Sequence, residues 1–266
     1  MHLGERLIRK VPAITLLFWV VKVLTTAQGE ATSDYLVHTI DPYIAVGLGA
    51  LGITVALALQ LYVRRYIAWA YWFAVVMVAV FGTMAADAVH IELKIPYAIS
   101  AAMCAAGLVV IFALWYRVER TLSIHSINTR RRELFYWAAV LATFAMGTAV
   151  GDLTAYTFRL GFLTSGLMFT VVFAIPFVAR RLVGLGEGVA FWFAYILTRP
   201  LGASYADWLG VPRSLGGLDY GRGTVAVVLT LAIAVFVAYQ SITKVDVERE
   251  DGLLTEPGLT GQPAAR

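Results

Sequence analysis

The stretch Phe18–Leu36, FWVVKVLTTAQGEATSDYL, contains a spacing of Trp, Gly and Asp that recurs along the chain. In this first copy Trp19 is followed by Gly29 and then by Asp34. The same offsets give three further sets, which are Trp72, Gly82 and Asp87, then Trp137, Gly147 and Asp152, then Trp192, Gly202 and Asp207. Matches at fixed offsets in every copy predict a four-fold internal repeat.

Two neighbouring positions share the pattern. An aromatic residue precedes each Trp, and these residues are Phe18, Tyr71, Tyr136 and Phe191. A small residue precedes each Asp, and these residues are Ser33, Ala86, Gly151 and Ala206. The repeat therefore extends beyond the three residue types that define it.

Composition places these repeats in a membrane. The chain is 60% hydrophobic and 14% charged, whereas soluble domains are about 45–50% apolar and 25% charged. Eight apolar stretches are long enough to cross a bilayer as helices, at 11–36, 43–63, 68–90, 96–116, 134–158, 162–179, 188–209 and 223–243. The sequence predicts an all-α integral membrane protein with eight transmembrane helices in four parallel two-helix repeats, over 11–63, 68–116, 134–179 and 188–243. These form one transmembrane domain, 1–243, and the polar segment 244–266 is expected to be a disordered cytoplasmic tail.

Basic residues predict the orientation. They cluster before the first stretch and in every second loop, at Arg6, Arg9, Lys10, Arg64, Arg65, Arg117, Arg120, Arg130, Arg131, Arg132, Arg180, Arg181, Lys244, Arg249 and Arg266. The opposite loops carry only Lys94, Arg159, Arg213 and Arg222. By the positive-inside rule both termini are expected in the cytoplasm. Because these basic residues lie in short clusters between apolar stretches, nucleic acid is not expected as their partner.

Helical geometry groups the unusual residues of the odd-numbered stretches. At 100° per residue, positions 3, 7, 11 and 15 after each Trp share one helix face with the Trp. Because the polar residues of these stretches lie on that face, we expect the odd helices to form an inner layer and the even helices an apolar outer layer. The repeated glycines, Gly29, Gly82, Gly147 and Gly202, should let the inner helices approach closely.

Four stretches resemble a known family. These are FWVVKVLTTAQGEATSDYL at 18–36, GTMAADAVH at 82–90, LSIHSINTRRRELFYW at 122–137 and FWFAYILTRPLGASYADW at 191–208. They are similar to bacterial membrane-anchored proteins of unknown function that contain four tandem two-span repeats, each with a Trp. The resemblance covers roughly 10–243. It implies a bacterial inner membrane and supplies no substrate.

Eight inner-face residues are candidates for a transport pathway: Lys22, Thr26, Glu30, Asp34, Asp87, Asp152, Arg199 and Asp207. Charges inside a membrane are costly and commonly mark a functional site with a partner. A closed ring of repeats would make the first and last inner helices neighbours, which predicts a network of Lys22, Glu30 and Arg199. The alternative is that the buried ion pairs and the aspartate hydrogen bonds only hold the repeats together.

Two further sets of residues are candidates for metal binding and for membrane anchoring. His38 with Asp41, and His90 with Glu92, are candidates for a divalent metal site at the outer face, although polar residues are ordinary in outer loops. The four Trp are expected at the cytoplasmic membrane interface as anchors.

These residues favour a transporter or permease with an acid-lined pathway for a cation or proton. Lys22 and Arg199 leave recognition of an anionic group open, and a scaffold or regulator with purely structural charges is the second hypothesis. No nucleophile motif, phosphate-binding loop or HExxH motif is present, so neither an enzyme nor a cofactor is expected. A pathway predicts a water-accessible cavity, whereas a scaffold predicts a packed interior with every charge paired. The oligomeric state is left open.

Overall fold

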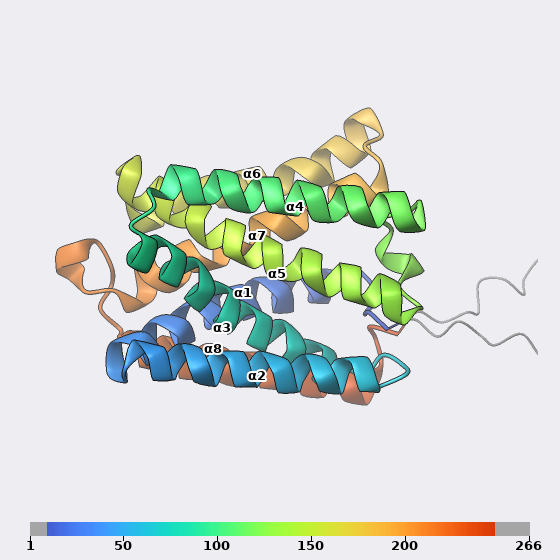
Figure 1. Cartoon of the computed structure of the whole chain (residues 1–266), viewed down its shortest axis with the longest axis horizontal. Helices are drawn as coiled ribbons and strands as arrows, with labels where there is room; N and C mark the ends of the chain where they lie inside the picture. Colours follow the sequence, from blue (N-terminus) through green and yellow to red (C-terminus); the bar gives the residue numbers. More distant parts are fainter. Residues whose placement is uncertain (1–9, 248–266) are drawn as a thin grey trace, which may run out of the picture.

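The structure is a computed structural model that describes residues 10–247. Eight long helices lie lengthwise beside one another in this part of the chain (Figure 1). They are α1 (Leu16–Thr39), α2 (Pro42–Tyr62), α3 (Ala68–Leu93), α4 (Tyr97–Glu119), α5 (Arg130–Asp152), α6 (Gly161–Val183), α7 (Glu187–Gly210) and α8 (Arg222–Thr243). A π-helical turn, η2 (Leu153–Thr157), extends α5, and two short 3₁₀ turns, η1 (Ile124–Ser126) and η3 (Arg213–Leu215), lie in loops. The prediction of an all-helical chain is confirmed.

Capping side chains set several helix starts. α1 begins at Leu16, later than the predicted 11, because the Thr15 hydroxyl accepts a hydrogen bond from Phe18 N at 3.2 Å. Asp41 caps α2, accepting from the backbone amides of Tyr43 and Ile44, and Pro42 takes the first helical position. Apolar patterning locates these segments, while the caps decide their ends.

Six of the long helices are long and apolar enough to cross a membrane, which marks the chain as a membrane protein. They are α2, the Ala68–Ala88 part of α3, α4, α5 continued to Thr157, α6 and α8. α1 and α7 are 24 residues each, about 36 Å at 1.5 Å per residue, so they have the length to span a bilayer. Lys22, Glu30 and Asp34 in α1, and Arg199 and Asp207 in α7, make these two helices more polar than the six.

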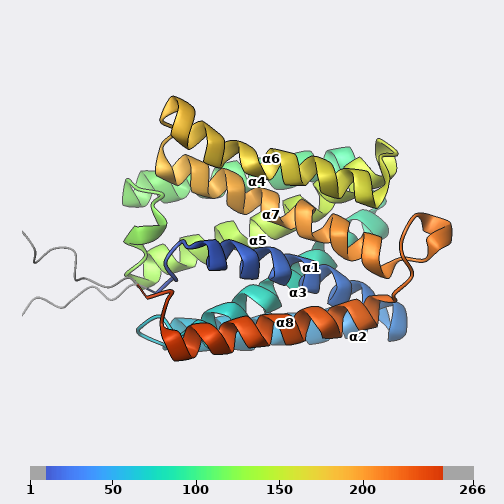
Figure 2. The same cartoon turned by 180° about the vertical axis from the view of Figure 1, so that it is seen from behind.

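The odd helices form a closed inner ring, as predicted. α1 packs against α3 and α7, and α5 packs against the same two helices. The spans of α3 and α5 are 67% and 56% buried, against 22–28% for α2, α4, α6 and α8. Figure 2 shows α1 and α7 lying between the outer helices α6 and α8. The inner layer therefore buries polar residues, and the outer layer covers it with apolar ones.

Each outer helix packs mainly on the inner helix of the following repeat. α2 covers α3, α4 covers α5, α6 covers α7, and α8 returns to cover α1. The sequence repeat is therefore not the packing unit. The contact between α7 and α1 closes the inner ring, and the packing of α8 on α1 completes the outer layer.

The repeated glycines face the next inner helix, as expected. A Cβ on Gly29 would lie 2.9 Å from the carbonyl carbon of Ala79, and one on Gly82 would lie 2.8 Å from the Cβ of Phe144. These distances are too short for any larger residue, so glycine at this position brings the inner helices into contact.

The predicted role of the Trp residues as interface anchors is wrong. Trp19, Trp72, Trp137 and Trp192 are at most 9% exposed and pack among the aromatic residues that precede them. The indole of Trp72 donates to Gln240 Oε1 at 2.7 Å, and that of Trp192 donates to Leu122 O at 3.0 Å. The aromatic pairs form the core of one end of the ring because they lie on its inner face.

We call that end the basic end, because the Arg-rich loops and both ends of the described chain lie there. The backbone joins them: Lys10 N donates to Ile127 O at 3.3 Å, and Ala13 N donates to Asp246 O at 2.8 Å. The opposite end, which holds the four repeated aspartates, is the acidic end. The basic residues Arg6, Arg9, Arg249 and Arg266, and most of the predicted tail, lie outside the described residues; 244–247 are described, and Asp246 is buried.

Candidate functional site

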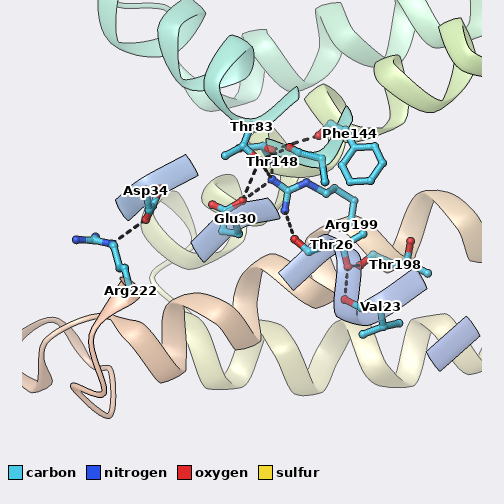
Figure 3. A network of polar contacts seen from close by, with 11 residues as sticks. Val23, Thr26, Glu30, Asp34, Thr83, Phe144, Thr148, Thr198, Arg199 and Arg222 are labelled. Atoms are coloured by element: carbon cyan, nitrogen blue, oxygen red, sulfur yellow. Dashed lines mark hydrogen bonds and ion pairs between the residues drawn. The ribbon is translucent and has the colours of Figure 1, made fainter. Parts of the chain in front are cut away.

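Arg199 occupies the middle of the inner ring. Its Nη2 donates to Glu30 from α1, to Thr83 from α3 and to Thr148 Oγ1 from α5, the last at 2.8 Å. Figure 3 shows the guanidinium held between these side chains. The three acceptors occupy the same position in their repeats, eleven residues after the Trp, where the fourth repeat has Ala203. One arginine thus fills a pseudo-four-fold site, and the repeat that supplies it contributes a small residue there.

Local packing explains how Arg199 reaches this position. A Cβ on Gly147 of α5 would lie 2.5 Å from Arg199 Cβ, so the glycine leaves room for the arginine stem. The guanidinium carbon lies 5.6 Å from the centre of the Phe144 ring. Thr26 Oγ1 donates to Thr198 O at 2.9 Å, and Nη1 of Arg199 donates to Thr26 O at 3.4 Å. Contacts between α1 and α7 therefore fix both the backbone and the charged group.

Lys22 lies deeper in the ring and is not part of this network. Its side chain is fully buried, and Nζ lies 4.3 Å from the centre of the Phe144 ring and 4.2 Å from that of Tyr195. The amine has no hydrogen-bond partner in the described structure. The predicted network of Lys22, Glu30 and Arg199 is thus correct for Glu30 and Arg199 and wrong for Lys22. Helical spacing places Lys22 on the correct face but two turns from Glu30, too far for its side chain to join.

Five carboxylates gather at the acidic end. Oxygens of Glu30, Asp34 and Asp207 all lie within 4.8 Å of one another. Asp87 and Asp152 pack beside His90 and Tyr97, and the space between these side chains is too small to hold a water molecule. The two groups act on each other electrostatically, since Glu30 and Asp34 repel Asp152. The carboxyls of the four repeats therefore lie close enough to repel one another.

The acids outnumber the cations beside them. Arg222, at the start of α8, donates from Nε to Asp34 Oδ2 at 2.9 Å, and Arg199 pairs with Glu30. Asp87, Asp152 and Asp207 have no ion pair among the described residues. Carboxylates this close together favour a proton or a cation between them, so the site is suited to binding a positively charged species.

The predicted histidine metal sites have other contacts. His38 Nδ1 lies 2.7 Å from Asp34 O, and His90 Nδ1 lies 2.5 Å from Ile95 O. Asp41 caps α2, and the Glu92 side chain lies outside the described part. The described residues within metal-ligand distance of one another are instead Glu30, Asp34 and Asp207.

A second polar cluster, at the basic end, was not predicted. Lys10 forms an ion pair with Glu133, and Gln60 Nε2 donates to Glu133 Oε1 at 3.2 Å. Nearer the ring axis, the hydroxyls of Tyr71 and Tyr136 lie 2.5 Å apart. Tyr71 and Tyr136 are the aromatic residues that precede the Trp in repeats 2 and 3, so the repeat contained the signal. The ion pair of Arg222 with Asp34 was also not predicted, because the sequence places Arg222 in a loop.

The chain was compared with known proteins. Searches of curated proteins and of solved structures found no match. A family model described as Repeat of Unknown Function (DUF347) matches four times, at residues 17–66, 70–121, 135–184 and 190–246. Each match contains one inner helix and the outer helix that follows it. Together these matches cover most of the chain, and the protein belongs to this family of four tandem repeats of unknown function.

Proposed function

We propose that this protein is a bacterial inner-membrane transporter for a small cation. Transport is driven either by coupling to protons or by the concentration gradient of the cation. In this proposal α1 and α7 cross the membrane together with the six apolar helices, giving eight spans. The basic end, with both termini, faces the cytoplasm, because the Arg-rich loops lie there. The acidic end then faces the periplasm and forms the mouth of the pathway. We propose no enzymatic activity and no cofactor.

The observation that supports this proposal is the gathering of Glu30, Asp34, Asp87, Asp152 and Asp207 around one end of the inner ring. Each of the four repeats supplies at least one of these acids. A carboxylate is expensive to bury, and repeating the cost in every repeat is explained if the group binds a cation. A ring of acids at a pore mouth also concentrates cations from solution.

The deeper part of the proposed pathway is closed in this conformation. Arg199 is paired with Glu30, and its guanidinium and the buried Lys22 amine both pack against the Phe144 ring. Transport therefore requires Arg199 to move away from Glu30. Proline at position 200, inside α7, weakens the helix beside this arginine by removing one backbone hydrogen bond.

A structural scaffold is the second candidate, and the same packing favours it. A scaffold predicts a filled interior and paired charges, and Arg199 satisfies both expectations. Lys22 does not, because its buried amine has no partner. The excess of acids over cations is also unexplained by a purely structural role. An anion transporter is less well supported, since Arg199 is already occupied by Glu30.

Flux measurement on the purified full chain tests the proposal. Proteoliposomes are given inward gradients of monovalent and divalent cations in turn, at several values of pH. A transporter should move at least one of these cations faster than empty liposomes do. The Glu30→Gln variant should fold and lose that flux or its pH dependence. Absence of flux for every cation, together with lowered stability of Glu30→Gln, would favour the scaffold.

A further inference from the structure

Lys22 is a buried amine that pairs with no carboxylate. Its Nζ lies between the rings of Phe144 and Tyr195, and the charged group that acts on it is Arg199, which repels it. Such an amine can gain or lose a proton without leaving a carboxylate unpaired. A permanently charged ammonium here would be costly, because it has no hydrogen-bond acceptor.

Tyrosine hydroxyls lie between Lys22 and the basic end. Tyr71 and Tyr136 share a hydrogen bond of 2.5 Å and are fully buried. The hydroxyl of Tyr195, whose ring lies under Lys22 Nζ, lies close enough to Tyr136 to interact with it and makes no well-formed hydrogen bond. The ring of Tyr66 lies 5.8 Å from that of Tyr71. Four tyrosines from three inner helices and one loop therefore lie next to one another, and Tyr71 and Tyr136 are already joined by a hydrogen bond.

Comparison among the repeats indicates that these hydroxyls are not needed for packing. Tyr71 and Tyr136 precede the Trp of repeats 2 and 3, where repeats 1 and 4 have Phe18 and Phe191. All four rings are buried in the same aromatic core. Phenylalanine thus fills this position in half of the ring, and the two hydroxyls in the other half are available for a different role.

The cluster ends at Asp246, just after α8. Tyr66 donates a hydrogen bond to Asp246 Oδ2, and the Asp246 backbone oxygen accepts from Ala13 N. Burial raises the pKa of Asp246, and the hydrogen bond from Tyr66 opposes that effect. Burial also raises the pKa of Tyr66, with the hydrogen bond to Asp246 adding to it. The carboxyl therefore takes up a proton more readily than an exposed aspartate does.

We propose that Tyr66, Tyr71, Tyr136 and Tyr195 form a proton-transfer chain between the Asp246 carboxyl and the Lys22 amine. This inference rests on the proposed transport function and names the proton as the coupling ion. When Asp246 is protonated, the Tyr66 hydroxyl turns from Asp246 towards Tyr71 and accepts a hydrogen bond from the carboxyl. Asp246 then releases one proton to Tyr66, each hydroxyl passes its own proton on as it receives one, and Lys22 changes from amine to ammonium. The net change is one proton moved, and every tyrosine ends neutral. The flexible four-carbon stem of Lys22 lets Nζ swing from the ring face to the Tyr195 hydroxyl.

Protonation of Lys22 explains what the proton-transfer chain would do for transport. A second positive charge beside Arg199 repels it, and the Phe144 ring, which both cations approach, cannot neutralise them. Glu30 is paired with Arg199, and Glu133 is paired with Lys10 at the basic end. The arriving proton therefore weakens the contact between Arg199 and Glu30 that closes the pathway. Once Arg199 moves away, Lys22 returns to the amine by passing the proton to Glu30.

Proton movement into proteoliposomes tests the chain. Full-length protein is reconstituted with a pH-sensitive dye inside the vesicles and with the transported cation on both sides, and a potassium diffusion potential drives protons inward. Wild type should acidify the lumen faster than empty liposomes. Tyr136→Phe should be slower by at least about tenfold, since a relay loses its conduction when one hydroxyl is removed. Tyr239→Phe, an exposed tyrosine on α8, should behave as wild type. If Tyr136→Phe fails to fold, Tyr195→Phe replaces it, because that hydroxyl makes no well-formed hydrogen bond.

Two results would overturn the chain: wild type that acidifies no faster than empty liposomes, or tyrosine variants that conduct as wild type does. Cation flux measured in the same vesicles separates this failure from failure of the transport proposal. Cation flux that persists without proton movement would overturn the proton-transfer chain and leave the transport proposal standing. Absence of both cation flux and proton movement would overturn both proposals.

Discussion

Gly202 in the last inner helix lies against Thr26 in the first, and this contact closes the ring. A Cβ at position 202 would lie 2.8 Å from both the Cβ of Thr26 and the backbone nitrogen of Ala27. The same relationship links Gly29 to Ala79, Gly82 to Phe144 and Gly147 to Arg199. In each case the glycine ten residues after one Trp meets the residue seven after the next, so one contact type is used at all four interfaces.

Substituting Gly202 with alanine should open this interface. The added methyl group meets backbone at Ala27, which cannot move aside cheaply, so Gly202→Ala should lower the free energy of unfolding by about 1–3 kcal/mol. Gly107→Ala in α4 is the matched control, because nothing lies within 4 Å of the added atom. It should be neutral or stabilising by about 0.5–1 kcal/mol. Denaturant unfolding in detergent measures both, and equal stability of the two variants would contradict the ring.

Removing the partner of Arg199 should be costly. Glu30→Ala leaves a buried guanidinium without its carboxylate, and such a change typically costs about 3–5 kcal/mol. Adding Arg199→Met should restore much of the lost stability, since methionine keeps an unbranched stem beside Gly147. Thermal unfolding of the single and double variants checks this. A double variant no more stable than Glu30→Ala would show that the ion pair is not the reason for the loss.

Reporter fusions test the proposed eight spans. Fusions after Arg120 and after Lys244 should be cytoplasmic, and one after Lys94 should be periplasmic. Fusions after Asp41 and after Gly216 should also be periplasmic, since α1 and α7 must cross the membrane to place these loops outside. If those two loops are cytoplasmic, α1 and α7 do not span the membrane and the polar ring is not a transmembrane pathway.

Thiol labelling tests whether water reaches the acidic end. Ala86 lies beside Asp87 and Asp152 and is partly exposed. In a Cys104→Ala background, Ala86→Cys should react with a membrane-impermeant thiol reagent added from the periplasmic side. Val228→Cys on the outer face of α8 should stay unlabelled, because lipid covers it. Protection of Ala86→Cys against the reagent would mean that the acids are sealed from solution.

The contact between Tyr66 and Asp246 should depend on pH. Because burial raises the pKa of Asp246 from its usual 3.8, the protonated carboxyl is favoured in the folded state. Its contribution to stability is complete below that value and is lost as the pH rises through the higher folded-state pKa. The unfolding temperature of wild type relative to Asp246→Asn should therefore fall as the pH increases. A difference that stays constant with pH would show that Asp246 does not titrate in this way.

The sequence predicted the ring and its faces because both follow from periodicity. The fixed offsets of Trp, Gly and Asp identify one face of each inner helix, and Arg199 met Glu30 as that geometry required. Which outer helix covers which inner helix could not be predicted, because α2, α4, α6 and α8 are similarly apolar. Their packing on the following repeat is decided by three-dimensional closure.

The predictions that were wrong concern the positions and partners of side chains more than the helices. The Trp residues were assigned to the membrane interface from their depth alone, although the repeat had already placed them on the inner face. Lys22 was assigned a carboxylate partner because buried charges usually have one. The tyrosine cluster was missed because its members come from different repeats and a loop, and no spacing along the chain relates Tyr195 to Tyr66.

Uptake by a variant of one inner-ring acid shows whether these acids bind the transported cation. Proteoliposomes of wild type, Asp207→Asn and Asp41→Asn are assayed side by side for the cation that wild type carries. Asp207 belongs to the carboxylate group at the acidic end, whereas Asp41 caps α2, a role that asparagine also performs. We expect Asp207→Asn to reduce uptake by at least about tenfold, equivalent to about 1.4 kcal/mol, and Asp41→Asn to leave it unchanged. If a folded Asp207→Asn protein takes up the cation as fast as wild type, the acids do not bind it.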